Sequence, residues 1–320
     1  MSDQLTTTQQ IDPAVATVYQ RTLLEPAYPQ YVHDRFATKF SINSKSGNTI
    51  KMRRYALYAA ATTPLSEGIT PNGHKQSKVD LLAQVSQFGD FCTITDVVDL
   101  TVEDPNIVIE VERQADQMRN TIDQLVRDVL AASASSTTCS NGSGTVTLLN
   151  KTDIDAVRLT LRTANAAYLT KLIQGNTAQG TSPISPAYWG IADADLEDDL
   201  EKVSGFKDVK NYASQATVDP DEYGSTGKVR WLTTTQGYVS SGTYSCPIIA
   251  KDAYGIVDIN GGNAKSIVKG FGSGGTADPL DQRATVGWKM WQVSRILNDS
   301  FVHVLCCTNG YVSIFDRKSQ

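Results

Sequence analysis

Apolar and polar residues alternate between Val79 and Val85, where Val79, Leu81, Ala83 and Val85 occupy every second position. A spacing of two places these side chains on one face of a β-strand. The preceding run over residues 50–61, "IKMRRYALYAAA", is also rich in residues that suit strands. We therefore predict a two-stranded ribbon. At about 3.3 Å per residue, twelve residues extend about 40 Å, which is the width of a small domain, so the ribbon must project beyond its own core.

The segment that joins the two strands is much longer than a hairpin turn requires. It reads "TTPLSEGITPNGHKQSK" and covers residues 62–78. A two-stranded ribbon in water is marginally stable and exposes backbone hydrogen-bonding groups along both edges. Its apolar face must be covered, and where the protein's own core cannot reach, a neighbouring copy must do so. The pattern thus indicates an oligomer whose subunits contact one another through extended segments.

A second hydrophobic pattern advances in steps of three and four residues and predicts a long helix over residues 104–132. Asp104 supplies an N-cap and Pro105 the first helical position, and neither Pro nor Gly interrupts the residues that follow. Some 29 residues correspond to about 44 Å of helix. The apolar positions form one packing stripe, made of Ile107, Val111, Ala115, Met118, Ile122, Leu125 and Val129.

The remaining pattern predicts a mixture of short helices and strands. The first fifty residues are polar and punctuated by proline, which is typical of an arm lying on another surface. Further on we expect a strand over 145–149 and then a helix whose capping box is formed by Thr152 and Asp155. An acidic helix within 188–206 and turn-rich strands over 206–275 should follow. The chain should close with a hairpin of two strands, over 285–297 and 300–308, that turns at Asn298 and Asp299. We expect the core face of the 152 helix to be formed by Ile154, Val157, Leu161 and Ala164.

Composition narrows the classes of function. The chain has 320 residues and a net charge of −5, which argues against direct wrapping of nucleic acid, because phosphate binding needs clustered Lys and Arg. No apolar window reaches the roughly 18 residues of a membrane span and the N-terminus lacks the pattern of a signal peptide, so we expect a cytosolic chain. The five cysteines include no CxxC and are expected to be reduced and mostly buried.

Candidate chemistry is sparse. His33, His74 and His303 lie in no recognised nucleophile or zinc motif. The glycines of residues 270–275, "GFGSGG", lack the Lys and Ser/Thr of a phosphate loop. One acidic group could serve a metal or a hydrolase, but we expect instead the solvated start of a helix, whose first turns favour negative charge; its members are Asp193, Asp195, Glu197, Asp198 and Asp199. We predict no catalytic, cofactor-binding or metal-ligating residue and no cofactor.

Three basic residues mark the first strand of the ribbon. Lys51, Arg53 and Arg54 are interleaved with tyrosines, but the acidic balance of the chain favours inter-subunit ion pairs over contacts with phosphate.

The order of these segments resembles the Hong Kong 97-type major capsid proteins of tailed bacteriophages. The resemblance rests on the sequence "MRRYALYAAATTPLSEGITPNGHKQSKVDLLAQVSQFGDF" followed by "TIDQLVRDVL", and it is similar in particular to the branch that includes the coliphage N-four capsid proteins. It is strongest over residues 49–130 and weakest over 206–275. It implies an α+β fold with an N-terminal arm, an extended β-hairpin loop, a long spine helix, a peripheral domain and an axial domain.

The resemblance also implies how the chain divides. It places the N-terminal arm at 1–48, the extended β-hairpin loop at 49–102, the spine helix and the first part of the peripheral domain at 103–185, the axial domain at 186–275, and the return strands of the peripheral domain with the C-terminus at 276–320. Because the arm begins almost at Met1, we expect any scaffolding protein to be a separate chain.

The implied function is that of a major capsid protein, which is not an enzyme and assembles as hexamers and pentamers into an icosahedral shell around double-stranded DNA. Its implied partners are copies of itself, a portal protein and a scaffolding or decoration protein, with weak or indirect contact with the packaged DNA and none with a membrane. Its implied location is the virion, and the host cytoplasm during assembly. A neck or tail protein, or an α+β hydrolase that uses residues 193–199, remains as an alternative. The expected inter-subunit contacts are Arg53, Arg54, Pro64, Leu65, Glu67, Gly68, Lys75 and Lys78.

Overall fold

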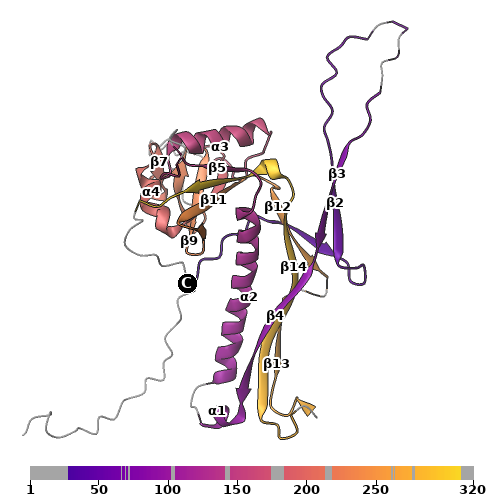
Figure 1. Cartoon of the computed structure of the whole chain (residues 1–320), viewed down its shortest axis with the longest axis vertical. Coiled ribbons are helices and arrows are strands. Elements are labelled where there is room, and N and C mark those ends of the chain that lie inside the picture. The colour runs from indigo at the N-terminus through magenta and orange to yellow at the C-terminus, as the bar shows by residue number, and fades with distance from the viewer. Residues whose placement is uncertain are drawn as a thin grey trace, which may run out of the picture.

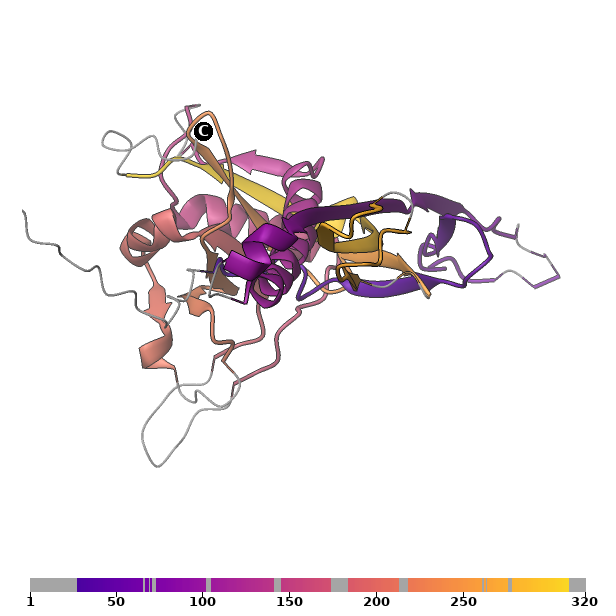
Figure 2. The same cartoon turned by 90° about the horizontal axis from the view of Figure 1, so that it is seen from below.

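The computed structural model describes residues 28–310, apart from 66, 69, 71–72, 102–104, 141–144, 174–183, 213–217, 261, 263 and 276–277. A long helix runs between two sheets, and a two-stranded hairpin projects away from both (Figure 1). Seen along the other axis, the hairpin extends to one side and the larger sheet lies on the opposite side (Figure 2). The fold is α+β.

The larger sheet has eight strands and contains most of the core. Its strand order is β5-β15-β11-β6-β9-β8-β7, and β10 pairs with β11. The bounds are β5 Ser136–Thr138, β6 Tyr188–Asp193, β7 Phe206–Asp208, β8 Glu222–Thr226, β9 Val229–Thr234, β10 Tyr238–Ser240, β11 Thr243–Ile249 and β15 Val302–Cys307. Every residue of β6 and β9 is buried, as expected of parallel central strands with both faces covered.

Short helices accompany this sheet. They are α3 Lys151–Thr163, η2 Ala194–Leu196, α4 Glu197–Lys202, η3 Val209–Asn211 and η5 Asp299–Phe301. Ile154, Val157 and Leu161 of α3 are buried in the same core as Trp231, which confirms the predicted face except at the half-buried Ala164.

The smaller sheet has five strands and is organised by β14 Arg283–Ile296. Along one edge β14 pairs with β12 Tyr254–Ile259 and then with β13 Lys265–Lys269. Along its other edge it pairs over ten residues with β4 Ser86–Thr95. The strand β1 Thr38–Ile42 extends the sheet beyond β12. One long strand therefore holds together segments from three parts of the sequence.

The long helix α2 covers residues Asn106–Ala131 and packs on one face of β14. The Trp288 indole donates a hydrogen bond to the Gln117 amide oxygen at 3.0 Å, and the Gln117 amide donates to Asp90 at 2.7 Å. A six-residue helix, α1 Asp96–Thr101, precedes α2 at the far end of the sheet.

The buried side of α2 differs from the predicted apolar stripe. The fully buried residues are Gln114, Asp123, Val126 and Leu130, whereas the predicted stripe is half-buried, and Ala115 is exposed. The stripe was wrong because α2 meets polar groups of β4 and β14 along its first half and the apolar core only near its C-terminal end. Pro105 occupies the cap position without a side-chain bond, and the predicted cap Asp104 lies outside the described residues.

The predicted ribbon is the hairpin of β2 Thr49–Tyr55 and β3 Lys78–Gln84, paired from Thr49↔Gln84 to Tyr55↔Lys78. Regular pairing ends at Tyr55 rather than at residue 61. The exposure of its predicted apolar face is graded: Ala83 and Val85 are 3% and 2% exposed, Leu81 is intermediate, and Val79 is 44% exposed. The base of the hairpin packs on the five-stranded sheet, and its outer half is exposed and belongs to none of the core clusters formed by the described residues.

Two short elements differ from expectation in the middle of the chain. Residues 146–149 are not a strand, although Thr147 donates its backbone N–H to Cys139 at 2.6 Å. The cap of α3 is Asn150, whose side chain accepts from the Asp153 N–H, rather than Thr152. The segment expected as one acidic helix begins with the buried strand β6, because its first six residues alternate too little to leave a polar face.

The closing strands do not form a hairpin. β14 and β15 belong to different sheets and are linked by η5. Sheet membership also mixes the predicted segments: β4 of segment 49–102 and β12 and β13 of segment 186–275 all join β14, whereas β15 joins the eight-stranded sheet. Sequence proximity suggested the hairpin, but the connection at residues 297–301 crosses from one sheet to the other.

Candidate assembly surfaces

The paired strands of the hairpin carry their own ion pairs. Asp80 accepts from Arg53 Nε at 2.8 Å and lies 2.9 Å from Lys51 Nζ and 3.8 Å from Lys78 Nζ. Hydrogen bonds from Lys51 and Arg53 lower the pKa of the Asp80 carboxyl to about 2. Lys51, Arg53 and Lys78 are thus paired within the ribbon, whereas Arg54 lies on the opposite face beside Val79. Their proposed role between subunits stays a prediction.

The wide end of the hairpin is exposed throughout its described residues. Leu57 and Leu65 are 97% and 78% exposed. Gly68 has a φ of 77° and nothing within 4 Å of where a side chain would start, so it turns the chain in open space. The rings of Tyr58 and His74 stack at 5.5 Å between centroids and link the two limbs of the loop. The expected contacts Pro64, Leu65, Glu67, Gly68 and Lys75 all lie in this exposed segment.

A cavity of about 400 Å³ lies where the hairpin diverges from the core. Its hairpin side is formed by Met52, Arg53, Arg54 and Leu81, and its core side by Phe40, Asp252, Leu297, Asn298 and Phe301. Apolar side chains flanked by one carboxylate and two guanidinium groups suit the side chains of another protein segment better than a reacting substrate.

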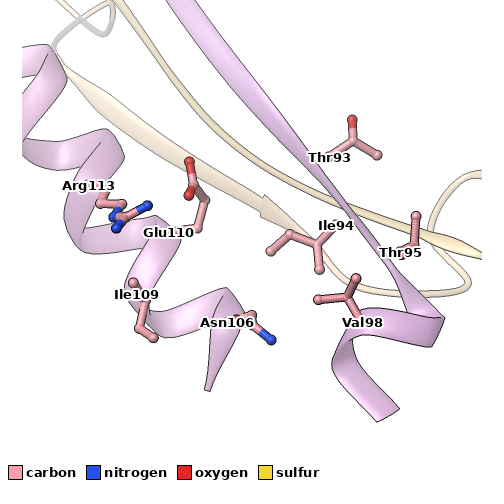
Figure 3. Close-up of a pocket in the computed structure, with 8 residues that line it drawn as sticks. All are labelled: Thr93, Ile94, Thr95, Val98, Asn106, Ile109, Glu110 and Arg113. Carbon is pink, nitrogen blue, oxygen red and sulfur yellow. The ribbon is translucent and has the colours of Figure 1, made fainter. Parts of the chain in front are cut away.

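A second cavity, of about 330 Å³, lies at the N-terminal end of α2, beside α1 and the end of β4 (Figure 3). It is lined by Thr93, Ile94, Thr95, Val98, Asn106, Ile109, Glu110 and Arg113. Its lining combines threonine hydroxyls and apolar side chains with the charged Glu110 and Arg113, and contains no histidine.

The end of the arm is fixed to α2 by one buried carboxylate. Asp123 accepts the backbone N–H groups of Val32 and His33 at 3.0 and 2.8 Å, and its other oxygen lies 2.8 Å from His33 Nδ1. The Tyr254 hydroxyl donates to the His33 carbonyl. His33 and Asp123 are 1% and 0% exposed. This network, which sequence reasoning did not find, anchors the arm rather than forming a reactive site, because all its groups are bonded to one another.

The acidic group at residues 193–199 supports the local fold. Asp193 caps η2, Asp199 accepts the Gly310 N–H at 2.8 Å and pairs with Lys202 at 3.2 Å, and Asp195 accepts from the Tyr244 hydroxyl at 3.1 Å. Asp193 and Asp199 are buried, so our expectation of a wholly solvated helix start was wrong for these two. Glu197 is half-buried and Asp198 is exposed. Leu196, Leu200 and Val203 are buried.

The other candidate groups are also accounted for locally. His303 Nε2 lies 2.7 Å from the Thr137 hydroxyl, and burial lowers the pKa of this histidine. Cys139, Cys246 and Cys307 are buried free thiols, and burial raises the pKa of Cys139. Within the part of the chain that the structure describes, no cluster of His, Cys, Asp or Glu is suited to a metal ion and no helix is long and apolar enough to cross a membrane.

Solved structures with this fold include phage capsids. The capsid of cyanophage P-SCSP1u matches with a TM-score of 0.65 at 11% identity, covering 97% of each chain. Cyanophage Pam1 matches with a TM-score of 0.64 at 10% identity, covering 97% of this chain and 99% of the other. The capsid of Helicobacter pylori bacteriophage KHP30 matches with a TM-score of 0.63 at 10% identity, covering 96% and 99%. These matches confirm the Hong Kong 97-type fold.

The sequence itself matches the model of the phage capsid protein family over residues 78–300, more than two thirds of the chain. No curated protein matches. The family match and the fold agree with the extended hairpin and the long helix. The chain belongs to the phage capsid protein family and is a major capsid protein of the virion shell, a structural protein and not an enzyme.

Proposed function

We propose that the subunits assemble into hexamers and pentamers in which the hairpin of one copy lies on the next. The observation that carries this proposal is the graded burial of the hairpin's apolar face. The alternating pattern is buried at Ala83 and Val85 and open at Val79, and the loop beyond it exposes Leu57 and Leu65. Apolar side chains this exposed are stabilised when another surface removes them from water, at about 25 cal/mol per Å².

The cavity at the fork of the hairpin supports the same proposal. It combines the half-buried side chains of Met52 and Leu81 with Arg54 and Asp252, so it can accept both apolar and charged side chains of a neighbour. The pairing of Asp80 inside the ribbon keeps the strands together without a partner, so the hairpin presents a formed surface before assembly.

We also propose the more detailed assignments that the sequence suggested. They are the likeness to the coliphage N-four branch, the division into peripheral and axial domains, assembly in the host cytoplasm, and a portal, scaffolding or decoration protein as partners. Copurification of the particle from cells that express the neighbouring genes identifies these partners directly.

Deletion of residues 64–75 tests the role of the hairpin tip. We expect the subunit to keep its circular dichroism spectrum and melting temperature, because the tip contacts none of the buried core clusters, and to form no closed particles in electron microscopy. A point variant sharpens the test: Leu65→Asp should lower the yield of particles, whereas Leu159→Asp, a similarly exposed leucine on α3, serves as the matched control. Normal particles from the deletion variant would overturn the proposal, and open rings from the wild-type chain would favour a neck or tail protein.

A further inference from the structure

The face of the five-stranded sheet that points away from α2 is covered by the base of the hairpin at Trp291 and Val293 and is open beside β13. Trp288 and Asp90 point toward α2, so the alternate residues of β14 and β4 point to the other side. This open side carries Lys265, Ile267 and Lys269 of β13, Lys289 of β14 and Phe91 of β4. We name these five residues the lysine face. All are exposed except the half-buried Ile267.

The lysine face concentrates positive charge. Lys265 stands directly opposite Lys289 in the antiparallel register, and Lys269 follows on the same side of β13. Like charges in opposed positions destabilise a strand pair. None of these three ammonium groups has an ion-pair partner among the described residues. The repulsion between them is relieved when an anionic group binds.

An apolar centre lies between the lysines. Phe91 and Ile267 are the neighbours of Gly287 on its two sides, and a Cβ at Gly287 would lie 2.7 Å from the Phe91 Cβ. The glycine therefore keeps the surface between the two apolar side chains low, and the Phe91 ring is 69% exposed. Lysines on an edge strand are often explained as protection against aggregation. Protection against aggregation explains Lys265 and Lys269, which lie on the edge strand β13. It does not explain Lys289, because β14 is paired along both edges, and it does not explain the exposed Phe91.

The helix α1 has the complementary chemistry. Val97 and Leu100 are 62% and 83% exposed, and Asp99 is exposed and has no partner among the described residues. The subunit's own α1 does not reach the pair of Lys265 and Lys289, because Lys289 pairs with Gly89, seven residues before Asp96, which is about 23 Å along β4.

We propose that the lysine face binds helix α1 of a second copy, with Asp99 between the lysines and Leu100 against Phe91. The contact joins two different surfaces of the subunit, so copies associate head to tail and a ring forms if the rotation closes. A DNA backbone would use the lysines but would leave the phenyl ring without a role. The inference rests on the proposed assembly of subunits, to which it adds a contact separate from the hairpin.

A charge exchange in the full-length chain tests the contact. Lys265→Glu with Lys289→Glu should leave the melting temperature unchanged, because both side chains are exposed and unpaired, and should lower the yield of closed particles at least about tenfold through repulsion of Asp99. Adding Asp99→Lys should restore the yield to within about twofold of wild type, since the signs are again opposite. Lys207→Glu, an exposed lysine of β7 without an ion pair, is the matched control.

The outcomes separate the alternatives. Normal particle yield from the double glutamate variant would overturn the contact, and normal shells that package less DNA would assign the lysine face to DNA instead. Loss of assembly without rescue by Asp99→Lys would reject α1 as the occupant. Failure of the wild-type chain to assemble would refute the proposed function itself, which the hairpin deletion examines separately.

Discussion

The β2–β3 hairpin and the β6–β9 pair use similar strand-forming residues for opposite purposes. β6 and β9 are buried at every position, with Trp231 and Tyr188 at 0% exposure. β2 and β3 contain one buried residue between them, Ala83. A strand with two covered faces contributes stability to its own subunit, whereas one with an open face has apolar area available for another. The comparison separates the residues that fold this protein from those that let it assemble.

The largest effect is expected where α2 enters the core of the subunit. Val126→Asp places a charge at a fully buried position and should reduce the free energy of unfolding by about 3–5 kcal/mol, measured by urea denaturation. Val108→Asp, on an exposed part of the same helix, should change it by less than about 0.5 kcal/mol. Similar losses from both substitutions would contradict the observed burial of Val126 and exposure of Val108.

A smaller loss of stability is expected where the arm meets α2. Asp123→Ala leaves the N–H groups of Val32 and His33 and the His33 ring without their acceptor, and should cost about 2–3 kcal/mol of unfolding free energy. Faster proteolysis near residue 33 should accompany it. Asp128→Ala, which removes an exposed partner of Arg127, should cost less than about 1 kcal/mol. If the two losses are equal, the arm is held by its apolar contacts and not by Asp123.

The smallest effect on the subunit is expected in the hairpin. Asp80→Asn should leave the melting temperature unchanged near neutral pH, because the carboxylate is solvent-accessible and lies outside the core. The pKa of Asp80 is lowered to about 2 from a reference value of 3.8, so its ion pairs contribute fully above about pH 4 and are lost as the pH falls through about 2. Carboxyl NMR of labelled aspartate measures this titration. A midpoint near 4 would show that Lys51 and Arg53 do not hold the carboxylate.

The spacing of apolar residues along the sequence predicted individual helices and strands but not how the strands pair. The ribbon, the long helix and the buried face of α3 follow from apolar spacing alone, because each is set by residues close in sequence. The partners of β14 could not be predicted in this way. They lie near residues 90, 256 and 267, and antiparallel pairing over such separations depends on backbone bonds that leave little trace in side-chain patterns.

The candidate assembly surfaces also include features that the sequence predicted and features that it did not. Exposure of the hairpin tip was predictable, because its length exceeds what a turn requires. The Asp123 network was not, since a carboxylate in the middle of a helix normally signals solvent, and only the fold brings residues 32 and 33 beneath it. The burial of Asp193 and Asp199 escaped prediction for the same reason.

The continuity of the hairpin with the five-stranded sheet has a mechanical consequence. β3 ends at Gln84 and β4 begins at Ser86, so a pull on the hairpin is transmitted through Val85 directly into β4. β4 is held to β14 by ten paired residues whose bonds lie across the direction of that pull. Such an arrangement is loaded in shear, and its bonds must fail together rather than one after another. A shell under internal pressure would therefore carry tension from subunit to subunit along the β3–β4 line without peeling its sheets apart.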